Sequence, residues 1–286
     1  MVKLGVIIDG ISRNLEHALT VMSEFQLIYA ELQYVTMPDG TDKEVGEMTT
    51  AEIDWIQRLV KSYQVKVSCL SRHIFSGLPV GEITTDHPVY LQQIEDLKKC
   101  IQMARALDCP LVRIMSFRKE MILFGSQGAE EWIVANDAWD QLLFLMDQPV
   151  RIAEDEGITL VVETGNGSMI TSAYLARQLI AQLDTDRLKV LWDPCNSLYC
   201  NEKAYPDGYR YLRDGHLGHI HLKDARIDIA KATVQFAPFN TGDMAQYLPD
   251  LAQALKDDDY TGIISLESVY RPNVASSELR SPAGAA

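Results

Sequence analysis

The chain has 286 residues, of which 47% are hydrophobic and 23% charged, so it can bury a large core and has an ordinary globular composition. Its formal net charge of −14 argues against a protein that grips nucleic acid, because such proteins usually present a basic surface to the phosphates. No apolar run has the length of a membrane span, and the five cysteines include no Cys-x-x-Cys pair, which indicates reduced thiols and a cytoplasmic location.

Short apolar runs alternate with longer amphipathic segments along the chain. Each run has the length of a strand, is rich in Val, Ile and Leu, and is hydrophobic almost throughout, as in parallel strands buried on both faces. The eight predicted strands are Leu4–Ile8, Leu27–Leu32, Val65–Leu70, Leu111–Met115, Ile158–Val162, Leu188–Trp192, His219–Leu222 and Gly262–Leu266.

Helical periodicity fills the gaps between these runs. The seven predicted helices are Arg13–Glu24, Thr50–Tyr63, His87–Leu107, Glu131–Glu156, Thr171–Leu183, Tyr205–Asp214 and Asp243–Lys256. We expect Ser12 to cap the first helix and Pro149 to kink or split the fourth. Eight strands alternating with helices predict an α/β fold, a single (β/α)8 barrel over residues 1–286, with a short or missing eighth helix and a frayed tail over 273–286.

Four consecutive predicted strands carry a potential metal ligand at the end where such barrels place their active sites. These residues are Glu163, Asp193, His221 and Glu267. A single acid at a strand end is usually a helix cap or a surface charge, but four on successive strands would each need a partner for a buried charge. One shared divalent cation supplies that partner. Carboxylates with one imidazole suit Mn²⁺, which we favour, as well as Mg²⁺, Co²⁺ or Zn²⁺.

The segments VVETGNG, LWDPCN, GHIHLKDAR and YTGIISLES resemble the sugar phosphate isomerase/epimerase superfamily, the xylose isomerase-like TIM barrels. The resemblance covers nearly the whole chain, and its motifs are specific in combination. It implies that Glu163, Asp193, His221 and Glu267 bind one metal ion, and that Glu163 and Glu267 also act as acid and base. Isomerising a ketose requires removal of a proton next to a carbonyl, and a cation beside the carbonyl stabilises the enediolate as it forms.

Other polar residues near these strand ends are expected to bind the substrate. Asn196 stands where many epimerases of this family carry a substrate-holding histidine, which separates the chain from the best-known ketose 3-epimerases. The other candidates are Lys223, Arg226, His73 and Glu31, and for Glu31 an indirect role behind the metal ligands is the alternative.

Two more residues inside predicted strands need buried partners. Arg113 is expected to brace a metal-binding carboxylate, and His219 to lie one layer deeper in the barrel than His221. Long segments after the second, third, fourth and seventh strands would roof the site. Five phenylalanines in these segments are expected to form apolar walls of the site: Phe75, Phe117, Phe124, Phe236 and Phe239.

The leading hypothesis is a metal-dependent isomerase or epimerase of a sugar or sugar-like polyol, with a small-molecule substrate and no nucleic-acid or membrane partner. A homo-oligomer is left open. The same metal and glutamates would also serve a lyase or dehydratase acting on an oxidised (keto) sugar or glycoside. A nuclease resembling endonuclease IV needs several more histidines, and none follows His221. A non-catalytic sugar-binding subunit on a barrel scaffold is the remaining alternative.

Overall fold

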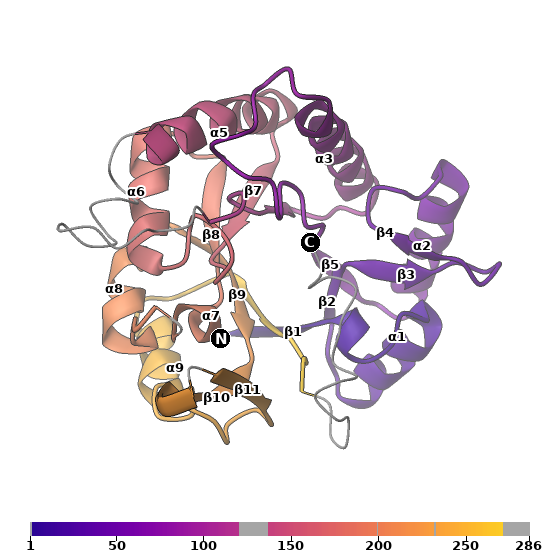
Figure 1. Cartoon of the computed structure of the whole chain (residues 1–286). Coiled ribbons are helices and arrows are strands. Elements are labelled where there is room, and N and C mark those ends of the chain that lie inside the picture. The colour runs from indigo at the N-terminus through magenta and orange to yellow at the C-terminus, as the bar shows by residue number, and fades with distance from the viewer. Residues whose placement is uncertain (1, 120–136, 199, 232, 271–286) are drawn as a thin grey trace.

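The structure of the chain is a computed structural model that describes residues 2–119, 137–198, 200–231 and 233–270. Eight parallel strands close into a barrel in the order β1-β12-β9-β8-β7-β6-β5-β2, and a ring of helices surrounds them (Figure 1). The predicted (β/α)8 barrel is therefore confirmed. Its strands are β1 (Lys3–Ile7), β2 (Tyr29–Leu32), β5 (Lys66–Leu70), β6 (Leu111–Ile114), β7 (Thr159–Glu163), β8 (Leu188–Trp192), β9 (Leu217–Leu222) and β12 (Ile263–Leu266).

Seven of the described helices overlap the predicted ranges, and a short helix directly after β8 was not predicted. They are α1 (Leu15–Glu24), α2 (Thr50–Ser62), α3 (Pro88–Ala106), α5 (Asp137–Glu156), α6 (Ala173–Leu183), α7 (Pro194–Leu198), α8 (Tyr209–Leu212) and α9 (Leu248–Asp257). The expected cap at Ser12 is wrong, because the side chain of Asn14 accepts the hydrogen bond from the backbone N–H of His17 at the start of α1. None of the described helices has the length and hydropathy of a membrane span.

Pro149 lies inside α5, which runs uninterrupted from Asp137 to Glu156, so the expectation that this proline splits the helix is wrong. A proline lacks the N–H that would bond the carbonyl four residues earlier, here that of Leu145. The hydroxyl of Tyr90, on the neighbouring helix α3, donates a hydrogen bond of 2.7 Å to this carbonyl. A side chain from another helix thus replaces the missing backbone donor.

Tyr90 also belongs to a stack of three aromatic rings with Phe75 and Phe117, whose centroids lie 5.0–6.5 Å apart. All three side chains are fully buried. The expectation that Phe75 and Phe117 wall the site is therefore wrong: they pack the loops after β5 and β6 onto α3. Phe236 and Phe239 are partly exposed, and Phe124 lies outside the described residues.

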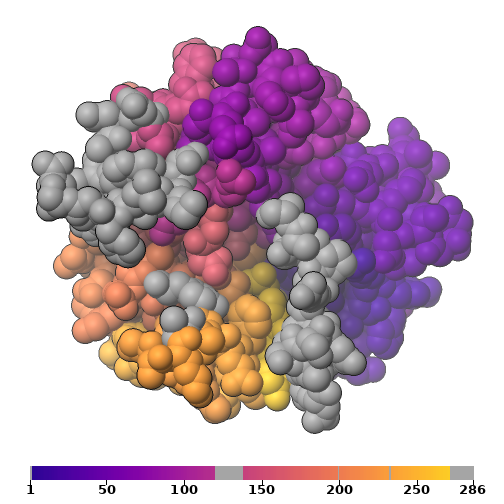
Figure 2. Space-filling view, in the orientation of Figure 1, coloured from indigo at the N-terminus to yellow at the C-terminus, as the bar shows by residue number. Residues whose placement is uncertain are grey.

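The long segments after β2 and β9 contain antiparallel hairpins that the sequence did not reveal. They are formed by β3 (Tyr34–Thr36) with β4 (Asp42–Glu44), and by β10 (Asp224–Asp228) with β11 (Thr233–Ala237). In the space-filling view the orange segment that contains β10 and β11 stands at the lower edge of the face shown (Figure 2). The buried carboxylate of Asp224 accepts four backbone hydrogen bonds of 2.8–3.0 Å, from Ala225, Thr241, Gly242 and Met244. It joins the start of this segment to its end.

The apolar core lies mainly between the barrel and its helices, and a separate small cluster of Cys69, Val161 and Leu191 fills part of the barrel interior. Successive residues of a strand alternate between its faces, so residues two positions further along also point inward. Beyond Val161 and Leu191 these are Glu163 and Asp193. The interior thus changes from apolar to charged toward the carboxyl ends of the strands. The predicted frayed tail, residues 273–286, and the eighth helix lie outside the described residues.

The replacement of a backbone donor by Tyr90 can be measured in a double-mutant cycle. Tyr90→Phe leaves the buried carbonyl of Leu145 without a donor and should lower the free energy of unfolding by about 1–3 kcal/mol. In a Pro149→Ala background residue 149 supplies its own N–H, so Tyr90→Phe should cost clearly less there. Chemical denaturation of the four proteins gives the coupling, and equal costs in both backgrounds would contradict the assignment.

Candidate metal centre

Four side chains meet at the carboxyl ends of β7, β8, β9 and β12. One potential ligand atom from each lies within 4.8 Å of the others, and the residues are those predicted from the strand ends: Glu163, Asp193, His221 and Glu267. Parallel pairing of neighbouring strands brings them together, since Glu163 aligns with Leu191 of β8 and His221 with Ser265 of β12. The barrel therefore gathers four residues that are far apart in the sequence.

Glu163 ends β7 and is almost fully buried. Its Oε2 accepts a hydrogen bond of 2.8 Å from Nη1 of Arg113, on the adjacent strand β6, as predicted. Burial alone would raise the pKa of Glu163, but the charge of Arg113, helped by His221 and Lys223, outweighs it and lowers this pKa. Nη2 of Arg113 also donates to the carbonyl of Ser71, so the guanidinium is fixed and Glu163 is held as an oriented carboxylate.

Asp193 follows β8 and is fully buried. Its Oδ1 accepts backbone hydrogen bonds from Cys195 and Asn196 in the first turn of α7, at 3.0 and 3.2 Å. Its Oδ2 lies 2.5 Å from Nζ of Lys223. Burial nevertheless raises the pKa of Asp193 to about 6, and the neighbouring carboxylates add to this rise. Lys223 therefore does not hold Asp193 in its ionised form as firmly as Arg113 holds Glu163.

Glu267 follows β12 and shares Lys223 with Asp193. Its Oε2 accepts a hydrogen bond of 2.6 Å from Nζ of Lys223. The side chain of Glu267 is 21% exposed against 6% for Glu163, so it is the more open of the two glutamates. Burial opposes ionisation of Glu267, yet the charges of Lys223 and His221 outweigh it and lower the pKa.

His221 presents its two ring nitrogens to different neighbours. Nε2 lies 2.8 Å from Oε1 of Glu31, whereas Nδ1 has no hydrogen-bond partner among the described residues. Nδ1 lies 3.8 Å from Oε1 of Glu163 and 3.9 Å from Oε2 of Glu267, too far for hydrogen bonds. A buried ring nitrogen that faces carboxylates at this separation has the surroundings of a metal ligand.

The charge balance also fits a divalent cation. Near His221, the described residues supply four carboxylates and two permanently positive groups. The carboxylates are those of Glu31, Glu163, Asp193 and Glu267, and the cations are Arg113 and Lys223. Without a metal, these carboxylates raise the pKa of His221 well above its usual value despite its burial, so the imidazolium supplies part of the missing charge. With His221 neutral as a ligand, two positive charges are missing, the charge of one divalent ion.

A second group of potential ligands shares His221 and consists of Glu31, His219 and His221. In this group Nε2 of each histidine lies only 2.8 Å from a carboxylate oxygen of Glu31. Ligand atoms of one cation lie about 3 Å or more apart, so these contacts are hydrogen bonds and leave no room for an ion. His219 is fully buried one layer below His221, as predicted.

Three of the predicted substrate-binding residues lie outside this cluster. Asn196 is the nearest, and its side-chain amide donates to the carbonyl of Thr164 at 2.9 Å. Arg226 is exposed on β10 and donates to the carbonyl of Thr241. His73 is half-exposed and contacts Gln33 and Glu44 beside the β3–β4 hairpin. The remaining two, Lys223 and Glu31, are buried within the charged cluster itself.

Asp9 is a residue at the strand ends that the sequence interpretation passed over. It follows β1, accepts a hydrogen bond from the backbone N–H of Tyr34, and lies 3.8 Å from Nε of Arg13. Burial raises the pKa of Asp9 to about 6, against the opposing effects of these two neighbours. The rule that identified the acids after the fifth, sixth and eighth strands, applied to the first strand, would have found it.

The raised pKa of Asp9 predicts a pH-dependent effect on stability. A carboxyl whose pKa is higher in the folded than in the unfolded chain contributes stability at low pH, and this contribution is lost as pH rises from about 4 through about 6. Asp9→Asn lacks this ionisation. Its free energy of unfolding relative to the wild type should therefore rise with pH, by at most about 3 kcal/mol. Urea titrations across this range test it, and parallel profiles would contradict it.

Replacing Lys223 tests the charge balance of the cluster. Lys223→Met removes a cation from two buried carboxylates and should destabilise the metal-free protein by about 3–5 kcal/mol. Mn²⁺ would replace the missing charge, so the rise in melting temperature on adding Mn²⁺ should exceed that of the wild type. Lys43→Met, which breaks the half-exposed ion pair with Glu52, is the control and should leave the Mn²⁺ response unchanged. An equal or smaller response in Lys223→Met would contradict the charge balance.

Residues 29–285 match the family model described as "Xylose isomerase-like TIM barrel", and the chain belongs to this family. No curated protein matches the sequence. The fold is similar to that of the probable 3-DHS dehydratase AsbF from Bacillus anthracis, with a TM-score of 0.69 and 13% identity, covering 93% of this chain and 92% of that one.

Two epimerase structures are also similar. L-ribulose 3-epimerase has a TM-score of 0.67 and 17% identity, covering 98% of this chain and 85% of its own. The 3-keto-D-glucoside 4-epimerase YcjR from E. coli has a TM-score of 0.65 and 14% identity, covering 98% and 97%. Identities this low show a shared fold, so the reaction must be argued from the site.

Proposed function

We propose that this chain is a divalent-metal-dependent isomerase or epimerase of a sugar or sugar-like polyol, and a cytoplasmic enzyme. One observation carries the proposal: Nδ1 of His221, which has no hydrogen-bond partner in the described part of the chain, faces carboxylate oxygens of both Glu163 and Glu267, at 3.8 and 3.9 Å. Glu163, Asp193, His221 and Glu267 would hold the cation, with Mn²⁺ favoured. When bound, it would stabilise negative charge on the substrate oxygens.

The two glutamates suit proton transfer on either side of one substrate carbon. Glu163 ends β7 and Glu267 follows β12, and two strands, β8 and β9, separate them around the barrel. In each glutamate Oε2 contacts a cation, Arg113 or Lys223, which orients the carboxylate. One glutamate removes a proton from the carbon next to the carbonyl, and the other returns a proton to the intermediate.

Lys223 has a supporting role in this scheme. Its ammonium group carries three protons and already contacts both Asp193 and Glu267. A third N–H directed toward a substrate hydroxyl would hold the sugar beside Glu267. Asn196, half-buried next to Asp193, would present its amide to a neighbouring hydroxyl, while His73 and Arg226 would contact more distant parts of the substrate.

The reaction is tested by incubating metal-stripped protein, reloaded with Mn²⁺, with a panel of ketoses and oxidised sugars in D₂O. We expect an isomer whose only added mass is deuterium, and NMR should find that deuterium at the carbon next to the carbonyl. A product that has lost water or an alcohol would identify the protein as a dehydratase or lyase. No deuterium entry with any substrate of the panel would contradict proton abstraction.

The acid and base roles are tested by Glu163→Gln and Glu267→Gln. Each should lower kcat by about 10²–10⁴-fold, the usual contribution of a positioned general acid or base. Glu47→Gln, which changes an exposed partner of Arg72, is the matched control and should keep normal turnover. Normal turnover in both site variants would refute the assignment, and circular dichroism with melting temperatures would show that the variants are folded.

A further inference from the structure

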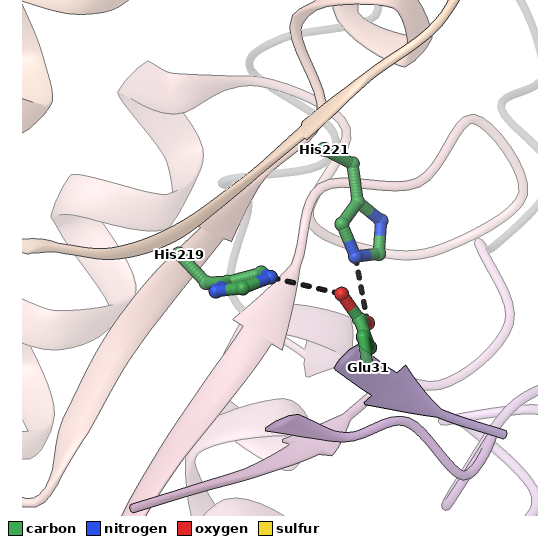
Figure 3. Close-up of side chains that lie close together, drawn as sticks. All are labelled: Glu31, His219 and His221. Carbon is green, nitrogen blue, oxygen red and sulfur yellow. Dashed lines mark hydrogen bonds and ion pairs between the residues drawn. The ribbon is translucent and has the colours of Figure 1, made fainter. Parts of the chain in front are cut away.

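Glu31, on β2, is a fully buried carboxylate that reaches across the barrel to two histidines of β9 (Figure 3). Its Oε1 lies 2.8 Å from Nε2 of His221, and its Oε2 lies 2.8 Å from Nε2 of His219. The two rings are nearly perpendicular, at 84°, and both point toward this one carboxylate. Glu31 thus joins the layer of the potential ligands to the layer below it.

The hydrogen bonds around Glu31 fix where the protons lie. An ionised carboxylate only accepts hydrogen bonds, so each histidine must present an N–H from Nε2. The hydroxyl of Ser71 is also bonded to Oε1, and the hydroxyl of Ser265 lies 3.0 Å from Nε2 of His219. Among the described residues, each hydrogen-bond partner of the Glu31 carboxylate is therefore a group that can donate.

This placement of the protons determines which ring nitrogen of His221 carries a lone pair. With its proton held on Nε2 by Glu31, the neutral ring carries its lone pair on Nδ1, the nitrogen that faces Glu163 and Glu267. The opposite tautomer would turn an N–H toward these carboxylates and remove the lone pair that a metal needs. The hydrogen bond to Glu31 also restrains the orientation of the His221 ring.

We propose that Glu31 is the positioning residue of the metal site: it selects the Nε2–H tautomer of His221 and so makes Nδ1 the ligand atom. His219 and Ser71 act one step further back by holding the two oxygens of Glu31 in place. This inference rests on the proposed function, since it assumes that His221 binds the cation. Glu31 would then act on the metal site indirectly and would not contact the substrate. The complete burial of its side chain is in keeping with this role.

The first test is Mn²⁺ affinity of metal-stripped protein, measured by the EPR signal of free Mn²⁺. Glu31→Gln keeps the shape of the side chain, but its amide nitrogen must face the N–H of either His221 or His219. We expect Mn²⁺ to bind about 10- to 100-fold more weakly. Glu44→Gln, which changes a carboxylate beside His73 outside the cluster, should bind Mn²⁺ as the wild type does.

The second test reads the tautomer directly and needs no variant. In wild-type protein labelled with ¹⁵N-histidine and loaded with Zn²⁺, we expect a proton on Nε2 of His221 and the zinc-dependent shift on Nδ1. Coordination through Nε2, or wild-type Mn²⁺ affinity in Glu31→Gln, would overturn the role of Glu31 and leave the metal site intact. If the wild type binds neither ion, the metal site itself fails, and the role of Glu31 fails with it.

Discussion

The excess of buried negative charge at the mouth of the barrel is the constraint on which the rest of the site depends. Carboxylates removed from water are costly unless each is paired and hydrogen-bonded. Arg113 compensates Glu163, Lys223 is shared by Asp193 and Glu267, and Glu31 accepts from two histidines. Two features mark the place where this compensation is incomplete: the pKa of Asp193, raised by burial, and Nδ1 of His221, for which the described residues provide no hydrogen-bond partner.

The barrel can accommodate this charged site because most of its apolar core lies outside the ring of strands. Most buried apolar side chains pack between the strands and the helices, so the interior can carry a polar layer above the small cluster around Val161. The loops at the rim are anchored independently: Phe75 and Phe117 stack with Tyr90 of α3, and Asp224 binds the backbone at both ends of the β10–β11 segment. Contacts of this kind restrain the loops around the four potential ligands.

Local sequence patterns predicted the strands and the four potential ligands. Parallel strands are apolar throughout, and the inward alternation places Glu163, Asp193, His221 and Glu267 on one rim whatever the details of packing. Arg113 could be assigned to a carboxylate because a charge within a buried strand needs a partner. These inferences required only short stretches of sequence and the rule that the barrel closes.

Contacts between distant segments could not be predicted in this way. Glu31 and His221 are 190 residues apart, and their hydrogen bond depends on the width of the closed barrel. The donor for the carbonyl freed by Pro149 is Tyr90 on another helix, so the sequence of α5 alone suggested a kinked or split helix. The two hairpins are built from short, partly polar strands, which periodicity does not distinguish from loops.

The central claim is that one divalent ion binds where Glu163, Asp193, His221 and Glu267 converge. Anomalous diffraction at the manganese absorption edge, from crystals of metal-stripped protein soaked in Mn²⁺, tests it most directly. We expect a single strong peak within about 2.5 Å of a ligand atom from each of the four residues, with Nδ1 as the atom of His221. A peak elsewhere, or none at this position with Mn²⁺ in excess, would contradict it.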